Sequence, residues 1–244
     1  MDDWFSVIAS DSELPGDAAR ELRDIGFVVI PGPVAPAKLA QLAAAYDAAV
    51  SGADPADVSI GSSTTRVHDF VNRGPDFDEL YVYAPILGAC CSIIGRPFKL
   101  SVMLARTVNP NSPAQALHVD FRREADGWPM VGFIIMVDEF RSDNGATRFV
   151  PGSHTWPIIP GDAMRDLALD HEPQVLACGP AGSVIVYNGS VWHGHSANQT
   201  PNLRRSIQGA YIRRDAEPGA NQATGIRQET LHRISPLAKY VLAV

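Results

Sequence analysis

The second half of the chain is a succession of short apolar segments, and this feature restricts the possible folds most. After Gly95, segments rich in β-branched and aromatic residues alternate with clusters of Asn, Gly, Pro and Ser: residues 99–108, 116–121, 130–137, 146–152, 182–194 and 204–212. Such a series is typical of strands joined by turns. One helical pattern, at 161–170, interrupts it. Because helices do not alternate with the strands, we expect a mainly β (α+β) fold, a double-stranded β-helix of the jelly-roll or cupin-like type.

The first third of the chain has helical patterns around one apolar strand. We predict a short strand at 27–32 and helices at 17–25, 36–51 and 77–95. Gly26 and Gly52 follow the first two helices, as expected of helix ends. Pro85 must kink or split the third helix. These helices are expected to support the β-domain from one side.

The domain organisation is predicted to be simple. No internal repeat or low-complexity linker divides the 244 residues, so we expect one domain. Its parts would be mainly helical support (1–95), a jelly-roll core (96–214) and a C-terminal loop and tail (215–244). The Gly-rich segment 215–229 is either a lid that orders on ligand binding or a plain surface loop.

Charge and cysteine content exclude several classes of protein. The net charge of −7 at pH 7 argues against binding to nucleic acid or to an anionic membrane surface. The three cysteines, Cys90, Cys91 and Cys178, form no disulfide framework and suit a reducing compartment. The acidic N-terminus does not resemble a signal peptide, and no apolar run is long enough to span a bilayer. We therefore expect a soluble cytoplasmic protein.

The segment LHVDF contains the first candidate metal ligands. His118 and Asp120 are one residue apart, so on a strand their side chains would share a face and converge, whereas on a helix they would diverge. Two imidazoles and one carboxylate form the facial triad of non-heme Fe(II) enzymes. The second imidazole should come from a late strand, where His193 and His195 compete for the role. A His-x-Asp pair also arises by chance, so spacing alone leaves the site undecided.

The other histidines have structural interpretations. His154, in VPGSH, could cap a turn or bind a backbone carbonyl. His171 and His232 lie in polar segments and are expected to be solvated.

An ordered set of motifs resembles the phytanoyl-CoA dioxygenase family of Fe(II)/2-oxoglutarate oxygenases. The motifs are RDIGFVVIPGPV, the segment from TTRVHDF to CCSIIG, AQALHVDF, DNGATRFVPGSH and VWHGHSANQTPNLRRS. The resemblance covers most of the chain and is greatest to the bacterial secondary-metabolism branch and its fungal relatives. One departure is Gly182-Ser183, where the family often has Gly-Asp; this pair is expected to shape a turn and to affect iron binding little.

The resemblance implies a specific set of ligands. In the family the distal histidine is followed by Gly, then by Asn, and by Arg eleven residues later; His193, with Arg204 eleven positions on, matches this pattern and His195 does not. His118, Asp120 and His193 are thus implied as iron ligands. His195 would lie behind them or face the substrate.

Arg204 is implied as the anchor for 2-oxoglutarate. A planar guanidinium meets a carboxylate with two parallel hydrogen bonds, which Lys cannot reproduce. Period-2 alternation places Arg204, Ser206 and Gln208 on one face, predicted to be the barrel interior, while Arg205 fits a surface position. The resemblance also suggests that Gln115 and Thr147 contact the cosubstrate.

The substrate pocket is expected near the barrel mouth. Its candidate residues are Arg66, His68, Asp69, Phe70, Arg106, Trp128, Trp192 and His195. Aromatic residues among them have an equally simple role in the core.

The resemblance implies a small-molecule oxygenase. Relatives that halogenate lack the carboxylate that Asp120 supplies, so hydroxylation or another C–H oxidation is expected. The resemblance implies that the protein binds Fe(II), consumes 2-oxoglutarate and O2, and releases succinate and CO2. Desaturation, epoxidation and cyclisation belong to the same class. The alternatives are a non-oxidative metal-dependent hydrolase or isomerase on a cupin-like barrel, in which Arg204 would lack a purpose, and a non-catalytic jelly-roll binding protein.

Overall fold

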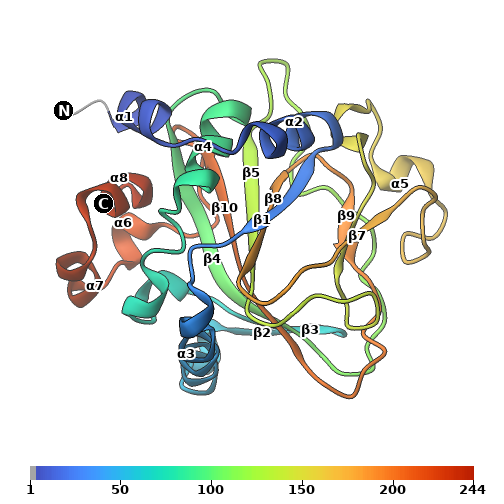
Figure 1. Ribbon diagram of the computed structural model, residues 1–244, viewed down its shortest axis with the longest axis horizontal. Coiled ribbons are helices and arrows are strands. Elements are labelled where there is room, and N and C mark those ends of the chain that lie inside the picture. Colours follow the sequence, from blue (N-terminus) through green and yellow to red (C-terminus); the bar gives the residue numbers. More distant parts are fainter. Residues whose placement is uncertain (1–3) are drawn as a thin grey trace.

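The computed structural model describes residues 4–244 and has the mainly β jelly-roll fold that the strand pattern predicted (Figure 1). A larger antiparallel sheet has the strand order β1-β8-β5-β10-β4-β3-β2, and a smaller one the order β7-β6-β9. The larger sheet contains β1 (Phe27–Pro31), β2 (Val58–Ile60), β3 (Thr64–Val67), β4 (Phe98–Val108), β5 (Met130–Met136), β8 (Ser183–Asn188) and β10 (Arg204–Arg213). The smaller sheet contains β6 (Thr147–Phe149), β7 (Val175–Ala177) and β9 (His193–His195).

Helices cover the outer side of the larger sheet, and Figure 1 shows α1, α2 and α4 along one end of it. The α-helices are α1 (Trp4–Asp11), α2 (Gly16–Ile25), α3 (Leu39–Ser51), α4 (Ala84–Ile93), α5 (Pro160–Ala163), α6 (Gln222–Gly225), α7 (Gln228–Arg233) and α8 (Pro236–Leu242). Short 3-10 helices are η1 (Pro36–Lys38), η2 (Pro55–Asp57), η3 (Phe70–Asn72), η4 (Pro75–Phe77) and η5 (Ser153–Thr155). Within the described residues, none of the helices combines the length and the apolar character needed to cross a bilayer.

Alternation along the central strands separates the core from the site. In β10, Ile207 and Tyr211 belong to the apolar core shared with the helices, whereas Arg204 and Gln208 line a cavity on the other face. In β5, Phe133 faces the helices, while Ile134 and Met136 face the smaller sheet. Because successive side chains of a strand point to opposite faces, each central strand contributes residues to the apolar core and to the site.

Two elements predicted in the second half differ from the structure. The strand at 116–121 is absent: His118 forms a single bridge with His193. Just after it, the N–H groups of Asp120 and Phe121 both donate to the Gly189 carbonyl, at 2.9 and 3.0 Å, which an extended chain cannot do.

The helix predicted at 161–170 is also wrong, because only α5 forms. The carbonyls of Leu167, Ala168 and Leu169 instead accept hydrogen bonds from the guanidinium of Arg148, which is 0 % exposed. Residues 167–169 are thus positioned by a buried cation from a distant strand, a long-range contact that local periodicity does not predict.

The first and last parts of the chain contain more regular structure than expected. The β2–β3 hairpin extends the sheet, and Pro85 lies in the first turn of α4, so the predicted helix is split there. The C-terminal tail forms α6, α7 and α8 instead of a loop. Ser235 caps α8 by accepting from the Ala238 N–H at 3.1 Å, and Val241 is buried in the core. The domain boundaries remain a prediction.

Candidate active site

Three of the predicted residues meet at one point between the sheets. The potential ligand atoms of His118, Asp120 and His193 all lie within 4.8 Å of one another. Asp120 Oδ1 is 3.7 Å from His118 Nε2, and Asp120 Oδ2 is 3.6 Å from His193 Nε2. The two histidines are brought together by reciprocal backbone hydrogen bonds of 3.0 and 2.9 Å between their N–H and carbonyl groups.

Local hydrogen bonds orient each of the three side chains. His118 Nδ1 lies 3.0 Å from the Ala116 carbonyl, and His193 Nδ1 lies 2.9 Å from the Val191 carbonyl. With Nδ1 donating, each Nε2 keeps a free lone pair directed at the common point. The hydroxyl of Tyr187 donates to Asp120 Oδ2 at 2.8 Å.

These residues fit a divalent iron ion. Burial, followed by the neighbouring His193, lowers the pKa of His118 to about 4, so its imidazole is neutral and able to bind a metal at neutral pH. Two imidazoles and a carboxylate are the donor set that holds non-heme Fe(II) and leaves coordination positions open. The triad therefore has the chemistry that the ion requires.

Arg204 lies at the opposite end of the same cavity, on the first residue of β10. Its Nη2 donates to the Gly145 carbonyl at 2.6 Å and its Nη1 to Ser206 Oγ at 3.2 Å, while the guanidinium stacks over Phe140 at 4.0 Å. Its Nε has no partner among the described residues. Burial, together with the charge of Arg106, lowers the pKa of Arg204 to about 9.

Arg106 is a second enclosed cation beside the triad. Its Nη2 donates to Gln115 Oε1 at 2.7 Å, and burial followed by the charge of Arg66 lowers its pKa to about 10. Neither Arg106 nor Arg204 forms an ion pair with a carboxylate within the part of the chain that the structure describes. A cation enclosed without a counterion favours binding of an anion. A dicarboxylate such as 2-oxoglutarate has the complementary charge.

The inner cavity, of about 50 Å³, also contains the predicted cosubstrate contacts. Its lining comprises Arg106, Gln115, His118, Asp120, Ile134, Thr147, Tyr187, His193, Gly194, His195, Arg204 and Gln208. His195 is part of this wall but not of the triad: its Nε2 lies 3.0 Å from Ser63 Oγ.

Two contributing residues were missed by the sequence analysis. Tyr187 holds the Asp120 carboxylate, and the alternation of β8 could have placed it on the inner face, although no pattern predicts its partner. Arg148 donates to the Gln115 carbonyl at 2.7 Å and so fixes the segment before His118.

A wider cleft of about 530 Å³ leads to the triad from outside. It shares Arg106, Gln115, His118, Asp120, Tyr187 and Gln208 with the inner cavity and adds Arg66, His68, Ser101, Val102, Leu104, Phe121, Met130, Gly209, Ala210, Glu217, Pro218 and Gly219. The segment 215–229 thus contributes to its wall, and the Gly219 N–H ties that segment to Ser101 Oγ at 2.8 Å.

The remaining substrate candidates lie elsewhere. Phe70 is buried in the apolar core, and Asp69 pairs with Arg227 at 3.2 Å. Trp192 is 1 % exposed and packs in a small apolar cluster. Trp128 donates to the His154 carbonyl at 3.4 Å, away from both cavities.

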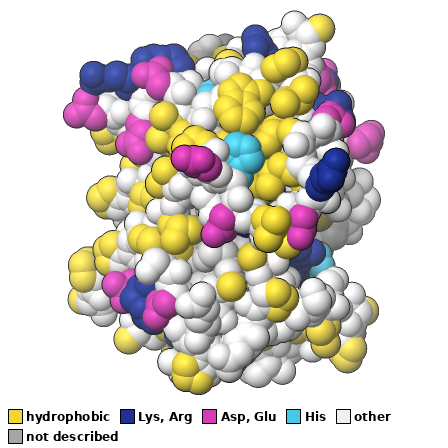
Figure 2. Space-filling view, turned by 90° about the vertical axis from the view of Figure 1, so that its right-hand side faces the viewer, with side chains coloured by type: hydrophobic (Ala, Val, Ile, Leu, Met, Phe, Trp, Pro, Cys, Tyr) yellow, Lys and Arg dark blue, Asp and Glu magenta, His cyan; other side chains and the backbone are white. Residues whose placement is uncertain are grey.

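The histidines outside the triad have structural surroundings. His154 Nε2 is 3.0 Å from the Arg23 carbonyl, in line with one of its two expected roles, and His232 is exposed as predicted. His171 is half-buried instead of solvated, with its ring 5.6 Å from that of Trp192. On the side that carries β7, β9 and α5, hydrophobic side chains surround a histidine among scattered charges (Figure 2).

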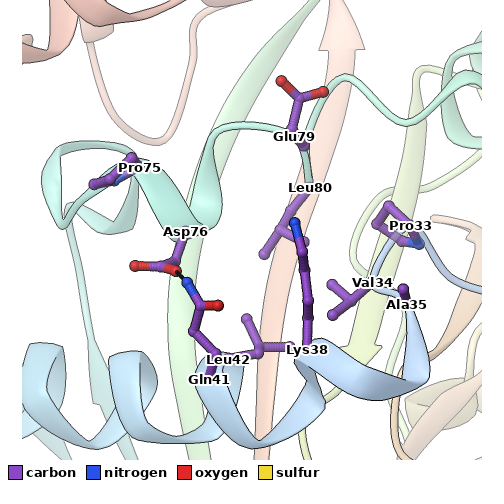
Figure 3. A pocket seen from close by; sticks show the side chains of 10 residues that line it. All are labelled: Pro33, Val34, Ala35, Lys38, Gln41, Leu42, Pro75, Asp76, Glu79 and Leu80. Carbon is purple, nitrogen blue, oxygen red and sulfur yellow. Dashed lines mark hydrogen bonds between the residues drawn. The ribbon is translucent and has the colours of Figure 1, made fainter.

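A separate cleft of about 400 Å³ lies between the start of α3 and the segment 75–80 (Figure 3). Gln41 Nε2 donates to Asp76 Oδ1 across it at 2.6 Å, and Leu42 and Leu80 form part of its lining. It shares no lining residue with the cavities at the triad and contains no histidine. The chemistry is therefore assigned to the triad cavity.

Comparison with known proteins gives a consistent result. The model of the family "Phytanoyl-CoA dioxygenase (PhyH)" matches residues 22–206. Dioxygenase cdmA of Talaromyces verruculosus is 38% identical over 108 residues, which cover 41% of this chain and 35% of cdmA. The multifunctional dioxygenase prhA of Penicillium brasilianum is 28% identical over 238 residues, 88% of this chain and 76% of prhA.

Solved structures share the fold. The epimerase SnoN, in complex with Fe3+, alpha ketoglutarate and nogalamycin RO, superposes with a TM-score of 0.68 at 18% identity, covering 87% of this chain and 89% of SnoN. HygX from Streptomyces hygroscopicus, with nickel, 2-oxoglutarate and hygromycin B bound, gives a TM-score of 0.68 at 17% identity over 84% of this chain and 90% of HygX.

Proposed function

Because this chain belongs to the phytanoyl-CoA dioxygenase family and is a 2-oxoglutarate-dependent dioxygenase, we propose that it hydroxylates, or otherwise oxidises, a C–H bond of a small organic molecule. In hydroxylation, O2 and 2-oxoglutarate are converted with the substrate R–H to R–OH, succinate and CO2. One oxygen atom enters the product and the other enters succinate.

One observation carries this proposal: the same cavity is lined by the candidate metal triad and by an enclosed arginine that has no carboxylate partner among residues 4–244. A hydrolase or isomerase would need the triad but not Arg204. A non-catalytic binding protein would need neither. Only a reaction that uses both a metal and an anionic cosubstrate accounts for the whole arrangement.

Several residues of the cavity have a proposed role in binding iron or 2-oxoglutarate. His118, Asp120 and His193 hold iron, which when bound supplies the activation of O2 needed to oxidise a C–H bond. Arg204 fixes the far carboxylate of 2-oxoglutarate. Gln115 and Thr147 border the same space and are proposed to contact the cosubstrate.

The biological setting is also proposed. The presence of Asp120 supports oxidation rather than halogenation, because it fills the ligand position that a halide would need. The relatives cdmA and prhA come from fungi, while HygX comes from Streptomyces. We propose that the protein acts in bacterial secondary metabolism and that it is located in the cytoplasm. Free cysteines at positions 90, 91 and 178 support a reducing compartment.

The decisive experiment measures succinate. Protein purified without oxygen is mixed with Fe(II) and 2-oxoglutarate, O2 is admitted, and succinate is quantified with and without candidate small molecules. We expect formation above the enzyme-free blank, even without substrate, through uncoupled turnover. A rate equal to the blank, with iron shown to be bound, contradicts the proposal.

A further inference from the structure

The cleft in front of the triad contains a cation that the protein leaves unpaired. Arg66 lies in β3 and lines the cleft together with His118 and Asp120. Among residues 4–244, its guanidinium has no hydrogen bond, ion pair or ring contact, although Glu217 lines the same cleft. The next arginine in the chain, Arg73, is by contrast paired with Asp57.

The position of Arg66 is unfavourable unless an anion joins it. The register of β3 and β4 places Arg66 directly opposite Arg106. Side chains opposite each other in an antiparallel pair are close, and like charges there are destabilising. Arg106 is occupied by Gln115 and Gln208, at 2.7 and 3.4 Å. Arg66 is the member of the pair that remains available to a ligand in the cleft.

The surroundings of Arg66 define the rest of the ligand. His68 lines the cleft two residues further along and is held by Ser59, at 3.0 Å between Oγ and Nε2. Apart from Ser101 and Glu217, the other side chains that line only this cleft are apolar: Val102, Leu104, Phe121, Met130, Ala210 and Pro218. Phe121 is 43% exposed at this wall. Such a cleft matches a molecule with an apolar body and one charged end.

We infer that Arg66 determines substrate specificity by pairing with a free carboxylate of the substrate, so that the substrates are small apolar carboxylic acids oxidised at a C–H bond away from the acid group. A guanidinium and a carboxylate form two parallel charge-assisted hydrogen bonds, which fixes orientation as well as affinity. This inference rests on the proposed function, because it takes the cleft as the substrate entrance.

Binding of matched acids and amides tests the inference. The protein is loaded with Ni(II) and saturating 2-oxoglutarate, which prevents turnover and keeps probe anions out of the Arg204 end. Isothermal titration calorimetry then compares 4-phenylbutyrate with 4-phenylbutyramide, and 1-adamantanecarboxylate with its amide. We expect each acid to bind about 10- to 100-fold more tightly than its amide.

Variants assign this preference to Arg66. In Arg66→Gln the acid should bind no better than the amide, Arg66→Lys should retain part of the preference, and Arg165→Gln, an exposed arginine outside the cleft, should retain all of it. Equal binding of acid and amide by the wild type, or an undiminished preference in Arg66→Gln, overturns the inference. Succinate formation without an acid preference overturns the inference alone, whereas an acid preference without succinate formation overturns the proposed function and, with it, the oxidation of the bound acid.

Discussion

The two ends of the inner cavity are built differently. At the metal end, His118 lies in an isolated bridge and His193 in the three-residue strand β9. The side chains of His118 and Asp120 are 34% and 26% exposed. At the other end, Arg204 begins the ten-residue strand β10, which pairs with β4 and β5 on its two sides, and it is 1 % exposed.

Under the proposed function, this difference follows from what each end binds. A metal ion links its ligands directly, so short segments oriented by local hydrogen bonds are sufficient. A carboxylate is held only by hydrogen bonds, so the guanidinium must be fixed in advance by a rigid strand. At that end Arg204 is enclosed and has no carboxylate partner among residues 4–244, and such a cation favours binding of an anion.

Removing a metal ligand should have the largest effect. We expect His193→Ala to lose Fe(II) binding and succinate formation by more than ~100-fold, because even residues behind metal ligands change affinity by about 10- to 100-fold. Metal content and succinate are measured together. His232→Ala, at an exposed histidine, is the matched control. Iron binding by His193→Ala at the wild-type affinity would show that His193 is not a metal ligand.

Changing the anchor should affect the cosubstrate and not the metal. Arg204→Met is expected to raise the KM for 2-oxoglutarate by about 100-fold or more, since two charge-assisted hydrogen bonds of about 1.5–3 kcal/mol each are lost. Iron content should stay at the wild-type level. Arg205→Met is the control, because Arg205 pairs with Asp138 and Asp47 outside the cavity. Equal KM changes in both variants would show that Arg204 is not the anchor.

Tyr187 tests whether the metal end depends on its supporting residues. Tyr187→Phe removes the hydrogen bond to Asp120 Oδ2 and should weaken Fe(II) binding by about 10-fold, with the KM for 2-oxoglutarate little changed. Competition with a fluorescent metal chelator measures the affinity. An unchanged metal affinity would mean that the ion orients Asp120 without help.

The smallest effect concerns the pH dependence of stability without metal. Burial lowers the pKa of His195 to about 3, against an ordinary value of about 6.5. The unfolded chain therefore binds a proton that the folded protein refuses, and stability should fall as the pH decreases from about 6.5 towards 3, by up to ~1.4 kcal/mol per pH unit. Urea unfolding of the wild type and of His195→Gln at pH 7 and pH 5 measures how much His195 contributes to the pH dependence of the free energy of unfolding. Identical pH slopes in the two proteins would contradict it.

Predictions from the sequence succeeded where they depended on alternation. The strand at 204–212 was expected to direct Arg204 and Gln208 inward and Ile207 towards the other face, and the structure has this arrangement. At His118 and Asp120 the predicted convergence of the two side chains is confirmed, but the strand that was expected to produce it is absent. There, two N–H groups share the Gly189 carbonyl, and this long-range contact bends the chain.

The C-terminal helices could not be anticipated for a related reason. The segments that form α6, α7 and α8 are short, and isolated helices of this length are marginal in water. They form because a covering partner is present: Ala238 and Val241 are buried in the core, and α8 contacts β4. The same holds for Tyr187, since its role depends on a carboxylate 67 positions away in the chain.

The sequence by itself determined the strand-rich fold, the residue types available for a metal and an anion, and the face of β10 that carries Arg204, because these depend on local periodicity and side-chain chemistry. Only the tertiary structure decided that Tyr187 donates to the Asp120 carboxylate, that His195 turns to Ser63, and that Arg66 and Arg106 stand opposite each other on neighbouring strands. The physical reason is that these relations arise from strand register and from hydrogen bonds between distant segments, for which neighbouring residues contain no signal.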